Sequence, residues 1–521
     1  MKTVGQALTE GLVARGVEVV FGIPGVHTIE LYRGLSGSGI RHVTPRHEQG
    51  AGFMADGYAR VSGKPGVAFV ITGPGLTNTL TAMAQARADS VPMLVISGVN
   101  RRGSLGQGLG LLHELPDQAG MVRALCPSFQ VTGPEVLDRC LNLAFAAMYE
   151  GRPGPVHIEV PTDVMGMEAV AAGEVPRLPL ALPAPAQIAE AAEMLNRAAR
   201  VLILAGGGAR GAAAQLRALA GALDAPVVQT VNARGIMAGH GLGVAASPSL
   251  EAVRALIAGA DQVLAIGTEF GPTDYDMYVR GGVPDLSGMI RVDICARQLA
   301  RQPAALMIRA DAGTVCEALL GRVRARAGAG APRAAAAMAA ARAEVAGLSL
   351  EMPAQIAFLE ALRDAVPGTI VVGDSTQPVY AGNLLYDHDR AGGWFNAATG
   401  FGALGFAPGA AVGAAIADPT ARVFCLIGDG GLQFSPAELR VAVDERLDVT
   451  YLVWNNAGYG EIAASMRQAN TEVIGCTPSP LGLEAFAAAC SMPYACIAPE
   501  PEALRSVIGT PGPRLIEVRD Y

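Results

Sequence analysis

Short apolar runs alternate with segments of helical periodicity along the whole chain. Residues 201–205, 423–427 and 450–454 form such runs, which are typical of strands buried on both faces of a parallel sheet. Strand and helix signals alternate in this way in three successive units. The pattern predicts an α/β protein made of three doubly wound parallel-sheet domains.

Two shifts in composition separate the three units. The first unit closes with a strand and a proline-marked exit at residues 151–164, and the Pro-rich stretch 173–186 that follows is typical of a linker. The second unit opens with a helix predicted at residues 187–198. It closes with the Ala/Arg-rich stretch 322–347, which indicates a helix with a connector. The predicted domains therefore cover residues 1–168, 186–330 and 350–521.

Composition and charge narrow the class of protein. Hydrophobic residues make up 51% of the 521 residues, but they are spread over short runs, and no stretch is typical of a transmembrane helix. The N-terminal segment is amphipathic and lacks the apolar core of a signal peptide. A net charge of -8 without a basic tract argues against nucleic-acid and membrane partners. We therefore expect a cytoplasmic protein, and its eight scattered cysteines indicate reduced side chains without disulfides or a zinc site.

One segment combines an acidic residue with a pair of carboxamides. Gly-Asp-Gly at residues 428–430 follows a strand and is separated by 24 residues from Asn-Asn, which ends a second strand. If both strands belong to one parallel sheet, Asp429 and Asn456 converge at its carboxyl edge. With the backbone carbonyl of Gly458 they supply the hard oxygen ligands that Mg²⁺ or Ca²⁺ prefers. The alternative is an ordinary strand-turn-helix in which Asp429 caps the helix and the asparagines form a turn.

The spacing of this segment resembles the cofactor signature of the superfamily of 2-oxo acid decarboxylases and acetohydroxyacid synthases, which bind thiamine diphosphate. Residues 41–98 independently resemble the pyrimidine-binding domain of the same superfamily. The resemblance implies that the three predicted domains are, in order, pyrimidine-binding, central and diphosphate-binding. It also implies that thiamine diphosphate and Mg²⁺ (or Ca²⁺) are the cofactors.

Glu48 matches the superfamily's catalytic glutamate. The resemblance implies that it hydrogen-bonds the aminopyrimidine ring and protonates it, so that the ring can activate the thiazolium carbon. Apolar neighbours such as Phe53 and Met54 favour a raised pKa for such a carboxyl group. The alternative is a solvated carboxylate in the first turn of a helix.

Further cofactor contacts follow from the same resemblance. Leu404 matches the apolar residue that holds the cofactor in a bent conformation, and Gly402 matches the residue whose carbonyl accepts from the exocyclic amine. The diphosphate contacts are expected from Thr376, Gln377, Gly430 and Gly431. The remaining cofactor-binding residues are expected to be Pro24, Gly73, Asn78, Gly428 and Tyr459.

The central unit carries a glycine pattern of its own. Gly206, Gly208 and Gly211 form a GxGxxG after a strand, but the acidic residue expected about 20 positions later in a dinucleotide site is not convincingly present. FAD is therefore possible but not expected. In relatives one cofactor bridges two subunits, which implies a homo-dimer or homo-tetramer with intersubunit active sites.

The chain departs from the acetohydroxyacid synthase pattern around the substrate. The family's tryptophan after Asn-Asn is replaced by Ser465, and its Phe-Gln-Glu by Leu112, His113 and Glu114. In combination, residues 22–35, 112–118 and 455–462 resemble the acetolactate-synthase-like 5-guanidino-2-oxopentanoate decarboxylases. They imply decarboxylation of a 2-oxo acid to an aldehyde and CO₂, with His27 and His113 as candidate proton donors. The predicted substrate residues are Val26, Glu461 and Ile462.

Glu461 has a specific candidate role, because its carboxylate could pair with a guanidinium group. For each histidine the alternative is a packed or surface imidazole, and for Glu461 it is a solvated carboxylate at a helix terminus. An acetolactate-forming carboligase shares every cofactor residue and stays open as an alternative activity. A non-catalytic paralogue would be expected to lose Glu48 or the metal ligands, and this chain keeps them.

Overall fold

The structure is a computed structural model that describes residues 2–170, 173–176, 178–279 and 281–521, so Arg177 of the Pro-rich stretch lies outside the described residues. The chain packs as two compact units. The first unit contains Met1–Leu178, Gly400–Ala495 and Pro511–Glu517, and the second contains Pro179–Thr399, Cys496–Thr510 and Val518–Tyr521.

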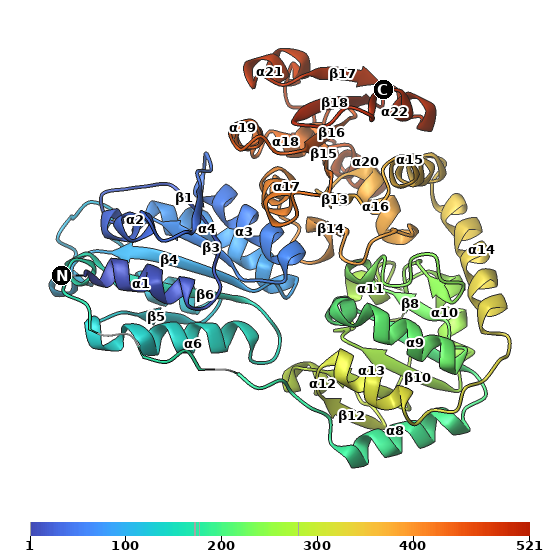
Figure 1. Cartoon of the computed structure of the whole chain (residues 1–521). Coiled ribbons are helices and arrows are strands. Elements are labelled where there is room, and N and C mark those ends of the chain that lie inside the picture. The colour runs from blue at the N-terminus through green and yellow to red at the C-terminus, as the bar shows by residue number, and fades with distance from the viewer. Residues whose placement is uncertain (1, 171–172, 177, 280) are drawn as a thin grey trace. The chain divides into compact units, whose positions relative to one another are not determined.

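The first parallel sheet is formed by the N-terminal part of the chain (Figure 1). Its strands are β1 (Val19–Gly22), β2 (Arg41–Val43), β3 (Gly66–Val70), β4 (Met93–Val99), β5 (Ser128–Gln130) and β6 (Pro155–Pro161). They lie in the order β2-β1-β3-β4-β6-β5. The helices of this part are α1 (Val4–Val13), α2 (Ile29–Leu35), α3 (Glu48–Ser62), α4 (Pro74–Ala88), α5 (Gln118–Arg123), α6 (Leu137–Tyr149) and α7 (Thr162–Met165).

The second sheet belongs to the central part of the chain, drawn in green and yellow in Figure 1. Its strands are β7 (Val201–Ala205), β8 (Val227–Gln229), β9 (Gly243–Val244), β10 (Gln262–Ile266), β11 (Ile290–Asp293) and β12 (Leu306–Arg309). Their order is β12-β11-β10-β7-β8-β9. The helices are α8 (Pro185–Arg197), α9 (Ala213–Leu223), α10 (Glu251–Ala258), α11 (Pro272–Tyr275), α12 (Ala296–Leu299), α13 (Ala312–Leu320) and α14 (Gly330–Leu348).

The third sheet contains the two strands that flank the Gly-Asp-Gly and Asn-Asn segments. Its strands are β13 (Ile370–Gly373), β14 (Trp394–Asn396), β15 (Val423–Gly428), β16 (Val449–Asn455), β17 (Tyr494–Ile497) and β18 (Arg514–Arg519). Their order is β14-β13-β15-β16-β18-β17. The helices are α15 (Met352–Ala365), α16 (Gln377–Leu384), α17 (Phe406–Ala417), α18 (Asp429–Leu432), α19 (Leu439–Asp444), α20 (Gly460–Gln468), α21 (Leu483–Ala489) and α22 (Pro501–Val507).

The predicted fold class is confirmed, because the chain forms three parallel sheets with intervening helices. The helix predicted at 187–198 is α8, and most of the Ala/Arg-rich stretch is α14. The predicted domain boundaries remain a prediction. Among the described residues, no helix combines the length and the apolar character needed to cross a lipid bilayer.

Helices α3 and α17 cross so closely that their backbones touch. A Cβ atom on Gly57 would lie 2.0 Å from the Ala410 carbonyl oxygen, and one on Gly413 would lie 1.9 Å from the Met54 carbonyl oxygen. Only a residue without a side chain fits at such a distance. The crossing therefore fixes the direction of α3, whose first residue is Glu48.

Replacing Gly57 by alanine should destabilise this crossing, because the new methyl group can be accommodated only by moving one helix. Overpacking of this kind costs about 1–3 kcal/mol. Thermal unfolding should show a lower Tm for Gly57→Ala. Gly166→Ala is the matched control, since nothing lies within 4 Å of its Cβ position. An unchanged Tm in Gly57→Ala would contradict the close crossing.

Candidate functional site

The Gly-Asp-Gly and Asn-Asn segments lie side by side. Strands β15 and β16 are parallel neighbours, with Gly428 paired with Trp454 at their carboxyl ends. Asp429 therefore begins α18 next to the point where β16 ends, and the Asn456 backbone N–H points to the Asp429 carboxylate at 3.4 Å. The convergence of Asp429 and Asn456 that the sequence predicts is thus present.

Three polar groups surround one point at this edge of the sheet. With its amide oriented to satisfy its neighbours, Asn456 Nδ2 donates to Asp429 Oδ1 at 3.1 Å and to the Gly458 carbonyl oxygen at 2.8 Å. If the amide turns over, it presents its oxygen to the same point beside the carboxylate and the carbonyl. That set of oxygens suits a hard divalent cation.

The electrostatics of Asp429 favour a bound cation. Burial raises the pKa of this carboxyl group, and hydrogen bonds from backbone N–H groups of Asn456 and Gly430 act in the opposite direction. A buried carboxylate is stabilised when a cation pairs with it. Among the described residues no cluster of three or more His, Cys, Asp or Glu side chains could hold a metal, so a cation here depends on one carboxylate with amide and carbonyl oxygens.

The two asparagines have different surroundings. Asn455 is turned away from Asp429 and donates to Glu517 Oε1 at 2.8 Å, while Glu517 also accepts from the Tyr494 hydroxyl. The first asparagine thus attaches the end of β16 to β18. The arrangement agrees with the expectation that Asn456, the second one, is the metal ligand.

Glycines keep the candidate metal loop compact. Gly428 ends β15, and a Cβ on Gly430 would lie 2.6 Å from the Tyr459 ring. Gly458 has a φ of 146°, and a Cβ atom added to it would lie 2.4 Å from the Cys476 carbonyl oxygen. Gly431 is buried within α18. The predicted residues Gly428, Gly430, Gly458 and Tyr459 are therefore parts of one packed loop region.

Glu48 begins α3 and is held by α4. The Glu48 carboxylate accepts a hydrogen bond from Asn78 Nδ2 at 3.0 Å. A Cβ atom on Gly75 would lie 3.5 Å from the other oxygen of the Glu48 carboxylate. Asn78, which the sequence suggests as a cofactor contact, thus contacts the predicted catalytic carboxylate. The side chain of Glu48 is half-buried, so one of its sides is open to a ligand.

Glu438 is a second carboxylate beside Glu48, and the sequence did not point to it. Its oxygens accept from the Arg46 backbone N–H at 3.2 and 3.1 Å, just before α3 begins. A Cβ on Gly50 would lie 2.4 Å from its carboxyl carbon. Burial raises the pKa of Glu438 to about 7, backbone N–H groups of Arg46 and His47 lower it, and the charge of Glu48 raises it. Glu438 is the only acidic residue between Asp429 and Asp444, which is the one signal that could have drawn attention to it.

Neutralising Glu438 should change how stability depends on pH. In the folded protein its pKa is about 7, above the 4.5 of a free glutamate side chain, so folding favours the protonated form. Protonation of Glu438 therefore stabilises the folded state. This stabilisation is fully present below pH 4.5 and is lost as the pH rises through 7. Glu438→Gln mimics the protonated acid and keeps this stabilisation at all pH values. At pH 7.5 the wild type has lost a free energy of unfolding on the order of 3 kcal/mol that the variant retains.

The measurement is thermal unfolding of the cofactor-free protein at pH 5 and pH 7.5. The Tm of Glu438→Gln minus that of the wild type should be more positive at pH 7.5. Glu445→Gln on the neighbouring segment provides a control, and a difference that does not vary with pH would contradict the expectation.

The two candidate proton donors lie in contact. The rings of His27 and His113 are 5.3 Å apart between centroids and nearly perpendicular, at 74°. The Nδ1 atom of each is buried and has no hydrogen-bond partner among the described residues. Burial and the nearby His113 lower the pKa of His27. Two imidazoles with free buried nitrogens are suited to holding or passing a proton.

The histidine pair adjoins the predicted Gly73 loop. A Cβ on Gly73 would lie 2.5 Å from the His113 carbonyl oxygen, and His113 has a φ of 62°, which is unusual outside glycine. Pro24 and Val26 lie in the exposed loop before His27, where Val26 is 63% exposed. The structure thus brings together His27, His113 and Gly73.

Glu461 and Ile462 lie in the first turn of α20 and are both exposed, Ile462 by 55%. Their helix starts beside the candidate metal loop, because the Cβ position of Gly460 lies 2.8 Å from Asn456 Nδ2. Thr376 and Gln377 occupy the start of α16, where the Thr376 carbonyl accepts from Val379 and Tyr380. Their predicted contacts with substrate and diphosphate remain predictions.

The loop that carries Gly402 and Leu404 has room for a ligand at one side. Gly402 has a φ of 75°, is exposed, and has nothing within 4 Å of its Cβ position. Leu404 is half-buried. Gly405 is packed tightly, and its carbonyl accepts from Ser435 Oγ at 2.8 Å. These features fit a flat ring placed against the Gly402 carbonyl.

The glycines of the central GxGxxG have a packing explanation. A Cβ on Gly206 would lie 2.2 Å from the Gly267 carbonyl oxygen, and one on Gly208 would lie 3.0 Å from the Gly267 Cα atom. Two backbone segments therefore approach each other where the sequence pattern suggests a phosphate loop. That FAD is possible but not expected stays a prediction.

Comparison with known proteins agrees with this organisation. Three thiamine pyrophosphate enzyme models match the chain: the N-terminal TPP binding domain at residues 2–121, the central domain at 188–319 and the C-terminal TPP binding domain at 374–518. A probable 2-ketoarginine decarboxylase of Pseudomonas aeruginosa is 42% identical, over 99% of this chain and 94% of that protein. The large subunit of acetolactate synthase isozyme 1 of Escherichia coli is 31% identical, over 97% and 92%. An acetolactate synthase of Mycobacterium bovis is 31% identical, over 88% and 77%.

Proposed function

Since the chain belongs to the thiamine pyrophosphate enzyme family, we propose that this thiamine diphosphate-dependent enzyme converts a 2-oxo acid to an aldehyde and CO₂ without oxidation. The observation that carries the proposal is the His27–His113 pair, whose buried Nδ1 atoms have no partner among the described residues. Formation of an aldehyde requires a proton at the carbon that has lost CO₂, and this pair is suited to deliver it.

The proposed roles of the other residues follow from their positions. Thiamine diphosphate, when bound, supplies the electron sink that decarboxylation of a 2-oxo acid requires. Asp429, Asn456 and Gly458 would hold Mg²⁺ or Ca²⁺, and the metal would hold the diphosphate. Glu48 would share a proton with the aminopyrimidine ring, and the hydrogen bond from Asn78 would orient its carboxylate.

We further propose that the substrate is 5-guanidino-2-oxopentanoate. The 42% identical relative is named a probable 2-ketoarginine decarboxylase, while the acetolactate synthases compared are 31% identical. Glu461 supports this choice because its exposed carboxylate at the start of α20 could form a bidentate pair with a guanidinium group.

The active enzyme is proposed to be a homo-dimer or homo-tetramer with intersubunit active sites. Glu48 accepts from Asn78 near the start of α4, whereas a Cβ atom on Gly400 would lie 2.7 Å from the side chain of Ala88 at the end of that helix. Asn78 and Ala88 lie about 15 Å apart along the helix, at about 1.5 Å per residue. This separation of Glu48 from the Gly402 loop of the same chain supports completion of each site by a second copy.

The test of substrate is CO₂ release from a panel of 2-oxo acids with thiamine diphosphate and Mg²⁺. We expect guanidino-oxo acid to be preferred over pyruvate, branched-chain and aromatic acids. Glu461→Gln should lower kcat/KM for the guanidino acid by about 10–100-fold, the loss expected for a charge-assisted bond, and leave pyruvate turnover unchanged. Glu484→Gln, also in a helical first turn, is the control. Equal losses for both acids would contradict the role of Glu461.

The carboligase alternative is supported by the similarity to acetolactate synthases. It predicts acetolactate from pyruvate, which acidification converts to acetoin for a colour assay. Aldehyde release without acetoin supports the decarboxylase, and acetoin as the main product would replace that proposal with the carboligase.

A further inference from the structure

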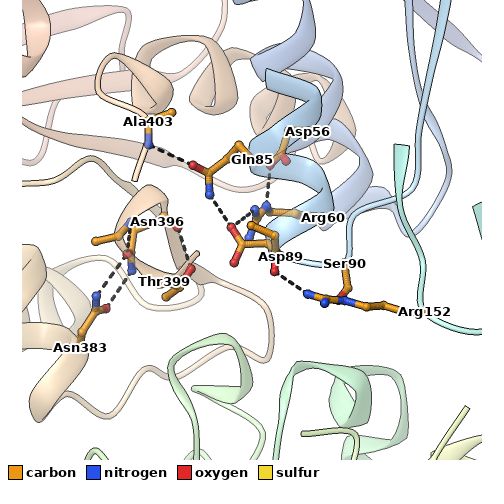
Figure 2. Close-up of polar contacts among 12 residues, drawn as sticks. Asp56, Arg60, Gln85, Asp89, Ser90, Arg152, Asn383, Asn396, Thr399 and Ala403 are labelled. Atoms are coloured by element: carbon orange, nitrogen blue, oxygen red, sulfur yellow. Dashed lines mark hydrogen bonds and ion pairs between the residues drawn. The ribbon is translucent and has the colours of Figure 1, made fainter. Parts of the chain in front are cut away.

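A buried polar network joins the ends of α3 and α4 (Figure 2). Arg60 on α3 pairs with Asp56 at 2.5 Å and with Asp89 at 2.8 Å. The three side chains are at most 2% exposed. A guanidinium buried between two carboxylates is strongly held in place, because removal of either partner leaves an uncompensated charge.

Gln85 connects this network to the loop that carries Gly402. Its Nε2 donates to Asp89 Oδ2 at 2.6 Å, and its Oε1 accepts from the Ala403 backbone N–H at 3.2 Å (Figure 2). Gln85 is fully buried. Because an ionised carboxylate only accepts hydrogen bonds, Asp89 fixes which end of the Gln85 amide faces Ala403. The glutamine therefore presents an acceptor to that N–H in one orientation.

The N–H of Ala403 and the carbonyl of Gly402 belong to the same peptide group. In a trans peptide the two point in opposite directions, so holding the N–H fixes the direction of the carbonyl. Gly402 has a φ of 75° and open space at its Cβ position, and glycine can turn its adjacent peptide group at little steric cost. The hydrogen bond from Gln85 opposes that rotation.

We propose that Gln85 is a positioning residue that aims the Gly402 carbonyl at the exocyclic amine of the bound aminopyrimidine ring. The inference rests on the proposed function and on the role that the family resemblance implies for Gly402, as the acceptor for that amine. Gln85 acts on the ring only through the peptide group between Gly402 and Ala403. Arg60 and Asp89 serve to keep the Gln85 amide in the required orientation.

Binding of two ligands to Gln85→Leu separates this role from a general loss of stability. The ligands are thiamine diphosphate and its 4′-oxo analogue, in which a carbonyl oxygen replaces the exocyclic amine. Both are titrated by calorimetry in the presence of Mg²⁺. Gln85→Leu should bind thiamine diphosphate about tenfold more weakly, as expected for one lost hydrogen bond. Its affinity for the 4′-oxo analogue should stay unchanged or rise, because a rotated peptide group offers an N–H to the oxygen.

An equal loss for both ligands, or no loss for either, would overturn the proposal. If the wild type binds neither ligand, the proposed function fails as well, so the two failures are distinguishable. Gln187→Leu is the control, because this glutamine donates to the Met307 carbonyl in the central part of the chain.

A second variant keeps the test decisive if Gln85→Leu does not fold. Gln85→Glu retains an oxygen that can accept from the Ala403 N–H but cannot donate to Asp89 when ionised. The affinity of Gln85→Glu for thiamine diphosphate, divided by its affinity for the 4′-oxo analogue, should therefore equal the wild-type ratio, even if the Tm of the variant is lower. A tenfold lower ratio in this variant would show that the acceptor at Ala403 does not determine ring recognition.

Discussion

Replacing Asp429 by asparagine should abolish the metal-dependent binding of thiamine diphosphate. The substitution keeps the size of the side chain but removes the only carboxylate among the three polar groups that converge with Asn456 and Gly458. A divalent cation loses its charged ligand there, and the diphosphate then loses the cation that holds it. We expect the affinity for thiamine diphosphate with Mg²⁺ to fall by at least about 100-fold, or about 2.7 kcal/mol.

Calorimetric titration with and without Mg²⁺ measures this effect. Wild-type protein should bind the cofactor far more tightly with the metal, and Asp429→Asn should show no difference between the two conditions. Asp448→Asn is the matched control, because Asp448 directly precedes β16, at the opposite end of that strand from Asn456, where it accepts from the Gly512 N–H. Tight, metal-dependent binding by Asp429→Asn would remove Asp429 from the site.

Replacing Glu48 by glutamine should separate binding from turnover. Glutamine has nearly the same shape and can still hydrogen-bond the aminopyrimidine ring, so the affinity for thiamine diphosphate should change by only a few fold. It cannot share a proton as a carboxyl group does. General acid-base groups contribute typically 10²–10⁴-fold to rate, and we expect kcat to fall within or beyond that range.

The experiment combines cofactor titration with the rate of CO₂ release at saturating cofactor. Glu10→Gln provides the control, since Glu10 is an exposed residue of α1 paired with Lys2. A kcat close to that of the wild type in Glu48→Gln would reject the catalytic role of this residue, whatever the binding data show.

The three-sheet fold was predictable because its signals are local. Apolar runs mark the buried strands, and the spacing of Gly-Asp-Gly and Asn-Asn indicates two strand ends at one edge. Pairing of β15 with β16 then brings Asp429 and Asn456 together. Periodicity and resemblance were sufficient here, since each strand carries its own pattern.

The remaining parts of the candidate site depend on contacts between distant segments. His27 and His113 were separate candidates in the sequence, and their ring contact arises from the folding of two loops. Gln85 and Ala403 are 318 positions apart and meet through helix packing. Periodicity of hydrophobic residues does not encode such meetings of polar groups. Glu438 was missed for the same reason.

The central glycine pattern shows the opposite problem, in which a local signal has two explanations. Gly206 and Gly208 match a phosphate-binding turn, yet both lie where another backbone segment approaches at Gly267. A short glycine motif reports that space is needed near the backbone. It does not report whether a ligand or the protein itself fills that space.

The glycine-mediated crossing of α3 and α17 bears on how such a chain can acquire new specificity. Positions 57 and 413 admit no side chain, because each would collide with a backbone carbonyl. Val26, Leu112 and Ile462, in contrast, are more than half exposed, and their replacement leaves the helix crossing intact. Variation is thus permitted at the residues proposed to face the substrate and forbidden where α3, the helix that begins with Glu48, crosses α17. A library that randomises the first set could search for new substrates without losing the cofactor.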